Sequence, residues 1–168
     1  LRGVAAARQR TPEVSVTIVG DGPELRRLKA LTSRLGVGPR VEFTGSLAGA
    51  DFDGIMARAD VAIGSLGEHR RGGHSLSTLK VRDYLARGLP IAVAGDDPDL
   101  RDNTPFSYRA PDDETDVDVA ALVDWLGNIR RAARADPNCA TAPERIRAFA
   151  ADRLDSRTRA AAILAALR

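Results

Sequence analysis

The sequence predicts an α/β fold in which a parallel sheet is covered by helices on both faces. Short apolar segments alternate with segments of helical periodicity along the chain, and this alternation is typical of parallel sheets. With 168 residues, of which 43% are hydrophobic, the chain is long enough for one domain with its own core. Ligands of such sheets bind beyond the carboxyl ends of the strands, so we expect functional residues directly after the strands.

Five apolar segments are expected to form the strands. The first, "VSVTIVG", is rich in β-branched residues and ends at a glycine, which is the pattern of a buried strand followed by a turn. The next three also end at or close to glycine. The expected strands are 14–20, 40–45, 60–65, 90–95 and 106–111.

Helical signals fill the segments between the strands. Pro23 suits the first position of a helix whose leucine stripe ends at Leu35, and Gly36 is expected to stop it. Asp51 is expected to cap a short helix. The opening segment 1–10 is also expected to be helical. The other expected helices are 23–35, a short helix that begins at 51, 79–87, 115–134 and 143–168.

Charge and cysteine content narrow the function classes. The formal net charge is only +2, and arginines are interleaved with acids, so nucleic acid is not an expected partner. Cys139 is the single cysteine, which excludes a disulfide framework and a zinc spacing and favours a cytoplasmic location. No run of 18 apolar residues occurs, so no membrane span is expected.

The turn "GDGP" follows the first expected strand. Gly20 and Gly22 let the backbone approach a ligand closely, and the helix behind them offers N–H groups to an anion. A strand-to-helix turn without a ligand would explain the same residues, so the sequence leaves both interpretations open. Neither a Gly-Lys-Ser/Thr sequence nor a complete GxGxxG follows, so a Walker loop and a nicotinamide cofactor are not indicated.

Hydroxyl residues and a cation gather at the start of the helix 79–87. Ser75, Ser77 and Thr78 precede the helix, and Lys80 lies in its first turn, where a cation opposes the helix dipole. An anion bound there reverses this effect, so the segment suits a diphosphate. Asp83 could then accept hydrogen bonds from ribose hydroxyls. A surface ion pair and an ordinary cap are the structural alternative.

The loop 64–75 holds both histidines, Glu68, Arg70 and Arg71. It is either a substrate loop or a solvated connector. The histidines lack the spacing of metal ligands, so no metal is expected. The acidic segment 96–99 is expected to be a turn with capping acids.

Two blocks resemble the retaining GT-B glycosyltransferases of group 1. One is "VTIVGDGPELRRLKALTSRLGVGPRVEFTGSL", and the other is "ADVAIGSLGEHRRGGHSLSTLKVRDYLARGLPIAV". The resemblance implies a Rossmann-like domain, one half of a GT-B fold, that binds the nucleotide sugar, with the N-terminal acceptor domain absent from residues 1–168. The segment 143–168 would pack on that absent domain or touch a membrane surface.

The resemblance also implies roles for individual residues. Base and ribose would lie over Gly20, Asp21 and Gly22 and over Gly45, Ser46 and Leu47, with the diphosphate at Ser77, Thr78, Leu79 and Lys80. Of two glutamates that the family carries seven residues apart, the second falls on Asp83 and the first on Ser75. Serine lacks the negative charge of glutamate, so we expect this departure to affect either the choice of donor sugar or the rate of sugar transfer.

The expected activity is transfer of a hexose from a nucleotide diphosphate sugar to an acceptor, with retention, with Lys80 as the catalytic residue and without a cofactor. The acceptor would be a sugar, a lipid-linked molecule or a small molecule, and residues 1–168 alone would be inactive. Epimerisation of a nucleotide sugar and non-catalytic binding of a nucleotide or a protein remain alternatives. A phosphorylatable receiver domain fits the acid pattern less well.

Overall fold

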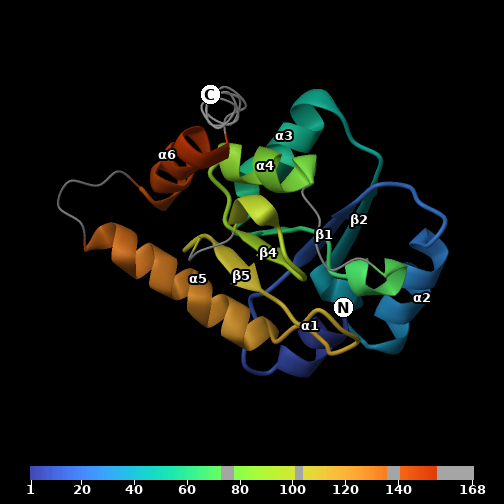
Figure 1. Ribbon diagram of the computed structural model, residues 1–168. Helices are drawn as coiled ribbons and strands as arrows, with labels where there is room; N and C mark the ends of the chain where they lie inside the picture. The colour runs from blue at the N-terminus through green and yellow to red at the C-terminus, as the bar shows by residue number, and fades with distance from the viewer. Residues whose placement is uncertain (73–77, 101–103, 136–140, 155–168) are drawn as a thin grey trace. The chain divides into compact units, whose positions relative to one another are not determined.

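The computed structural model describes residues 1–72, 78–100, 104–135 and 141–154, and it divides into two compact units. Unit 1 contains residues 1–59 and 116–123, and unit 2 contains 60–115 and the described residues from 124 onward. All strand pairs are parallel, and helices follow the strands along the chain (Figure 1). The predicted α/β class with parallel strands is therefore confirmed.

Unit 1 is built on a two-stranded parallel sheet. Val16 lies opposite Val41, and the register shifts between Ile18 and Val19. Thr17 and Glu42 are exposed on this sheet, so the prediction of a strand buried on both faces is wrong here. The elements are α1 (Arg2–Ala7), β1 (Val16–Val19), α2 (Leu25–Arg34), η1 (Gly38–Arg40), β2 (Val41–Gly45), α3 (Gly49–Arg58) and the start of α5 (Val119–Arg134).

The core of unit 1 joins the chain start to the first turns of α5. Buried apolar side chains from α1, from the turn after α2 and from α5 form one cluster. The Arg40 guanidinium donates hydrogen bonds of 3.0 Å to the carbonyl oxygens of Thr11 and Arg8, which ties the segment after α1 to the start of β2. The buried members are Val4, Ala7, Val37, Val119 and Ala120.

Unit 2 contains a three-stranded parallel sheet in the order β3–β4–β5. The central strand β4 is buried at every position, as expected for a strand covered on both faces. The elements are β3 (Ala62–Ile63), η2 (Glu68–Arg71), α4 (Leu79–Ala86), β4 (Ile91–Val93), η3 (Pro98–Leu100), β5 (Ser107–Arg109), the rest of α5 and α6 (Ala142–Leu154).

Aromatic contacts attach the helices of unit 2 to its sheet. The rings of Tyr108 on β5 and Trp125 on α5 meet edge to face at 5.7 Å, and so do those of Phe106 and Phe149 on α6. Helices α4 and α6 pack against each other. Among the side chains that are almost fully buried are Leu85, Ile91, Leu100 and Ile146.

Several predicted boundaries need correction. Helix α2 begins at Leu25 and not at Pro23, because Pro23 and Glu24 form the turn before it. Asp51 does not cap α3, whose N-cap is Ala48; it lies in the first turn, where a carboxylate still favours the helix dipole. Helix α5 begins at Val119, four residues later than expected. The described strands form two sheets and not one, because β3 is regular for two residues only and pairs with β4.

Candidate functional site

The ends of β1 and β2 come together in unit 1, as the sequence predicts. The Gly20 amide donates to the Gly45 carbonyl oxygen at 2.7 Å, and the Ser46 amide donates to Asp21 Oδ2 at 2.9 Å. Gly45 has φ of 73°, and a Cβ there would lie 3.2 Å from Asp21 Oδ2. The Asp21 carboxylate therefore holds the two turns together at the expected edge. Gly22 and Leu47 lie in the same turns.

A second group of predicted residues lies in unit 2, at the carboxyl ends of β3 and β4. There the start of α4 meets the loops that follow the two strands, around a hollow of about 10 Å³. Thr78, a predicted site residue, forms part of the wall, and Glu68 comes from η2. The residues that line the hollow are Ser65, Glu68, Thr78, Val81, Val93, Ala94 and Asp97.

The N-terminal end of α4 is open to solvent. Thr78 is the N-cap with extended backbone, but its side chain makes no capping hydrogen bond. Leu79 is 86% exposed, and Lys80 is exposed. Lys80 makes no hydrogen bond or ion pair with any residue that the structure describes. Within the described residues, no side chain caps the first amides of α4 and none pairs with the Lys80 ammonium, which suits an anion at this helix start.

Asp83 is paired with Arg87 and not with Lys80. Its two carboxylate oxygens each lie 3.0 Å from Arg87 Nε, in an i,i+4 pair on the surface of α4. Asp83 thus forms the surface ion pair that the sequence offered as the structural alternative, but its partner is Arg87 and not Lys80. Ser75 and Ser77, like His74, lie outside the described residues.

A buried ion pair beneath the start of α4 is not visible in the sequence. Arg82 donates two hydrogen bonds to Asp97, at 2.8 Å and 3.0 Å, and the side chains are only 14% and 5% exposed. The same guanidinium donates to the Thr78 carbonyl oxygen at 2.8 Å. Asp97 therefore is not a solvated turn residue: it ties the loop after β4 to the helix start. In the sequence, the acidic segment 96–99 after a buried strand indicates only that an acid lies at this place, and it does not indicate the partner.

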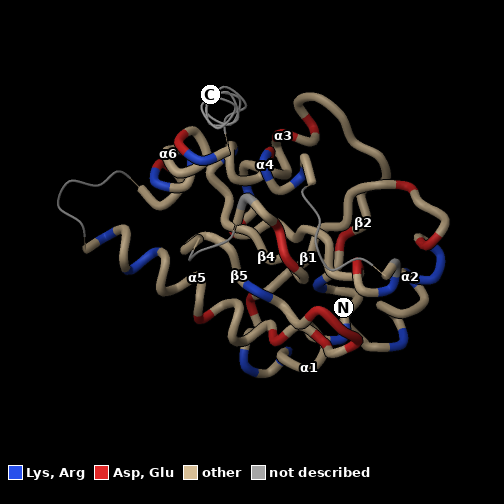
Figure 2. The backbone as a smooth tube through the Cα atoms, viewed as in Figure 1, with Lys and Arg blue, Asp and Glu red and all other residues tan. Residues whose placement is uncertain are grey.

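A charged cluster holds η2 to the segment that follows β5. Arg70 Nε and Nη2 donate to the two carboxylate oxygens of Glu114, and His69 Nε2 lies 3.2 Å from the same carboxylate. Hydrogen bonds from Arg70 and then His69 lower the pKa of the Glu114 carboxyl to about 2. Figure 2 shows a red, acidic stretch of chain before α5. The cluster fixes the loop that carries Glu68.

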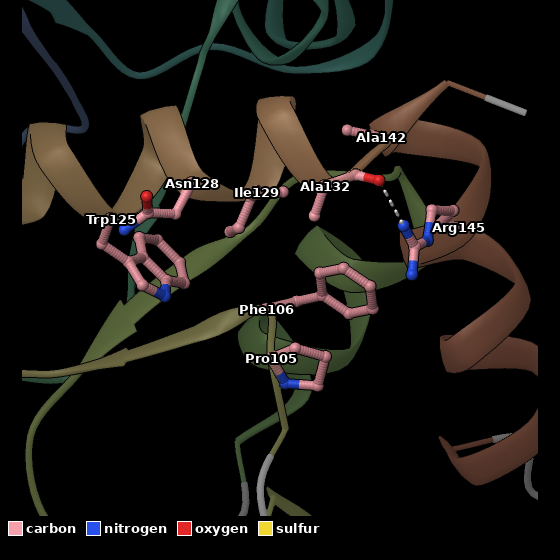
Figure 3. A pocket seen from close by; sticks show the side chains of 8 residues that line it. All are labelled: Pro105, Phe106, Trp125, Asn128, Ile129, Ala132, Ala142 and Arg145. Carbon is pink, nitrogen blue, oxygen red and sulfur yellow. Dashed lines mark hydrogen bonds between the residues drawn. The ribbon is translucent and has the colours of Figure 1, made fainter. Parts of the chain in front are cut away.

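A larger groove lies elsewhere in unit 2. It has a volume of about 250 Å³, is mostly apolar, and lies between α5 and α6 (Figure 3). Arg145 crosses it to donate to the Ala132 carbonyl oxygen at 3.2 Å. Pro105 and Phe106, at the amino end of β5, form its floor, so the groove is away from the carboxyl ends where ligands of parallel sheets bind.

No metal site or membrane-spanning helix was found in the part of the chain that the structure describes. No three His, Cys, Asp or Glu side chains gather there as candidate ligands of a metal ion. The helices described are too short or too polar to cross a membrane. Both findings hold for residues 1–72, 78–100, 104–135 and 141–154.

Comparison with known sequences gives consistent results. The sequence model of the family described as "Glycosyl transferases group 1" matches residues 1–126. Over 148 residues the chain is 31% identical to the GDP-mannose-dependent alpha-(1-6)-phosphatidylinositol monomannoside mannosyltransferase of Mycolicibacterium smegmatis. This match covers 79% of the chain and 36% of the relative.

Comparison with solved structures confirms the predicted Rossmann-like fold. HepE of Anabaena in complex with UDP matches 99% of this chain with a TM-score of 0.65 and 20% identity. The complex of HepE with UDP-glucose matches with a TM-score of 0.64. Sucrose-phosphate synthase from Thermosynechococcus elongatus matches with 0.61 and 18% identity. The chain spans 44% of HepE and 41% of the synthase, less than half of each.

Proposed function

Because this chain belongs to the group 1 glycosyl transferases, we propose that it binds a nucleotide diphosphate sugar whose sugar is transferred, with retention, to an acceptor hydroxyl. The family match favours transfer over epimerisation and over mere binding. The observation that carries the proposal is the start of α4, which follows a strand of the sheet: Leu79 and Lys80 are exposed there, and the N-cap Thr78 makes no side-chain capping hydrogen bond.

The donor is proposed to be a nucleoside diphosphate hexose. HepE was crystallised with UDP and with UDP-glucose, and the mycobacterial relative is GDP-mannose-dependent by name. Unit 2 is proposed to bind the diphosphate of this donor, to which the start of α4 offers positive potential.

The mechanism that these residues support is electrostatic. When the bond between the anomeric carbon and the diphosphate oxygen breaks, negative charge grows on the diphosphate and positive charge on the sugar. The Lys80 ammonium and the first amides of α4 would stabilise the departing diphosphate without a proton transfer. In other enzymes one such donor contributes about 2.7–4 kcal/mol to the transition state.

The acceptor and the location belong to the same proposal. We propose that the acceptor, a sugar, a lipid-linked molecule or a small molecule, is bound by a domain beyond the residues of this chain, because the chain spans 36% to 44% of its relatives. The single cysteine favours a reducing compartment, and we propose a cytoplasmic location with a membrane surface as a possible contact of the C-terminal segment.

Isothermal titration calorimetry tests the donor proposal. The protein is titrated with UDP, UDP-glucose, GDP and GDP-mannose. We expect one nucleoside diphosphate and its sugar to bind, with an affinity that falls as salt is raised, because the diphosphate is held by charge. Adenosine diphosphate and ADP-glucose extend the set to a third base. Absence of binding by all six ligands contradicts the proposed function.

A further inference from the structure

The hollow beside the start of α4 has the size of one hydroxyl group. Its volume of about 10 Å³ is close to the space that a single water molecule requires. A diphosphate is far too large for it and must lie outside, over the exposed Leu79 and Lys80. The hollow is therefore a place for a small polar group next to the diphosphate.

Two polar groups in the wall of the hollow have no partner. Thr78 Oγ1 is buried and makes no hydrogen bond among the described residues. The half-buried Glu68 carboxylate makes neither a hydrogen bond nor an ion pair within that part of the chain. A buried hydroxyl without a partner is costly, so a ligand that satisfies it is favoured. Glu68 can only accept hydrogen bonds, whereas Thr78 can also donate one.

The remaining charges fix this wall and are themselves occupied. Asp97 faces the hollow, but Arg82 holds its two oxygens and also holds the Thr78 carbonyl oxygen. On the other side Arg70, next to Glu68 in η2, is bound to Glu114. Glu68 and Thr78 are thus held in place from both sides, and no group of the described residues occupies them on the side of the hollow.

We propose that Glu68 and Thr78 bind one hydroxyl group of the donor's sugar and that Glu68 determines which sugar the site accepts. This inference rests on the proposed function. The sugar hydroxyl donates to the Glu68 carboxylate and accepts from Thr78 Oγ1, replacing the hydrogen bonds of a water molecule of the same size. A phosphate oxygen fits poorly, because it carries no proton for Glu68 and is repelled by its charge.

The test separates recognition of the sugar from recognition of the nucleotide. Glu68→Gln keeps the size of the side chain and removes its charge. We expect its affinity for the bound nucleotide sugar, among UDP-glucose and GDP-mannose, to fall about tenfold, since hydrogen bonds to charged groups are the stronger ones. Its affinity for the matching UDP or GDP should stay unchanged or rise, because these ligands carry no sugar beyond the diphosphate.

Two further variants sharpen the result. Thr78→Val keeps the shape and loses the hydroxyl, and we expect a smaller loss that is again confined to the nucleotide sugar. Glu13→Gln removes a carboxylate from an exposed position in unit 1 and should change neither affinity.

The outcomes distinguish the inference from the function on which it rests. If Glu68→Gln leaves both affinities unchanged, or lowers both equally, the inference is overturned while donor binding stands. If the unmodified protein binds none of the nucleotides, the proposed function fails, and the inference fails with it. A loss limited to the nucleotide sugar supports the inference.

Discussion

Lys80 is the residue on which the proposed chemistry depends most directly. The chain has two lysines, and only Lys80 lies at the start of a helix that follows a strand end; Lys29 instead lies over the Phe43 ring at 5.7 Å. In a longer protein that contains residues 1–168 and transfers sugar, we expect Lys80→Ala to lower kcat by about 100- to 1,000-fold. Steady-state transfer of radiolabelled sugar measures this effect.

Two variants act as controls for that prediction. Lys80→Arg keeps the charge and should retain more activity than Lys80→Ala, though the different shape of the group prevents full recovery. Lys29→Ala removes an exposed cation–π contact and should leave kcat near the unmodified value. Activity of Lys80→Ala within two- or threefold of the unmodified protein would show that Lys80 does not stabilise the departing diphosphate.

The pair formed by Arg82 and Asp97 supports the helix start rather than the chemistry. Because both side chains are largely buried, removal of one leaves an uncompensated charge, and we expect Asp97→Ala to lower the free energy of unfolding by about 3–5 kcal/mol. The exposed pair of Asp83 and Arg87 serves as a matched control, and Arg87→Ala should cost less than about 1 kcal/mol. Urea denaturation followed by circular dichroism measures both.

A double-mutant cycle checks that the cost comes from the pair itself. Arg82→Met combined with Asp97→Ala removes both charges of the pair, so the double variant should be more stable than the sum of the two single losses implies. Additive losses would mean that the two groups do not stabilise each other, in spite of their bidentate geometry.

At the scale of elements, two helices end in the same way but in different surroundings. After α2, the amides of Gly36 and Val37 donate to the carbonyl oxygens of Ser33 and Thr32, and after α4 those of Gly88 and Leu89 repeat the pattern. Both glycines have positive φ, of 66° and 84°. A Cβ at Gly36 would meet open space, whereas at Gly88 it would lie 2.7 Å from the carbonyl oxygen of Pro143, in the first turn of α6.

This difference predicts unequal costs of the same substitution. Gly36→Ala should destabilise the protein by about 1–2 kcal/mol, the cost of an L-residue in the left-handed region. Gly88→Ala should cost at least about 1 kcal/mol more, because α4 and α6 must also move apart. Urea denaturation of the two variants measures the difference, and equal losses would show that α4 and α6 separate without cost.

The elements were predictable from the sequence to the extent that they depend on local patterns. Hydrophobic periodicity and glycine stops predicted each described strand and the ends of α2 and α4 to within a few residues. Both signals are local, because each depends only on residues close together in the sequence. The pairing of Arg82 with Asp97 was not predictable, since it joins residues 15 apart across the loop after β4. Separation into two sheets depends on tertiary pairing and carries no local signal either.

The sequence predicts which segments follow the strands but not which side chains meet there. The structure places Gly20 beside Gly45 and Thr78 beside Glu68, and that a ligand binds at these strand ends stays a prediction. The partner of Asp83 was foreseen only as a surface cation, and the structure identifies it as Arg87. Side-chain pairing on a helix surface has several near-equal solutions, which sequence spacing alone does not separate.

At the scale of the whole molecule, the length of the chain relative to its relatives sets what it can do alone. It spans 36% of the mycobacterial mannosyltransferase and 44% of HepE. Transfer requires the acceptor hydroxyl to be held within reach of the sugar in a site that excludes water. We propose that the groups that bind the donor lie within residues 1–168, among them the start of α4.

We therefore expect residues 1–168 to bind the nucleotide sugar without transferring it, whereas a longer protein that contains them does both. Calorimetry measures binding, and radiolabelled donor with candidate lipid-linked and soluble acceptors measures transfer. The longer protein with Lys80→Ala is the control, because it should bind acceptor normally and still fail to transfer. Transfer by residues 1–168 at the rate of the longer protein would mean that the acceptor groups lie within this chain, and the division of roles proposed here would be wrong.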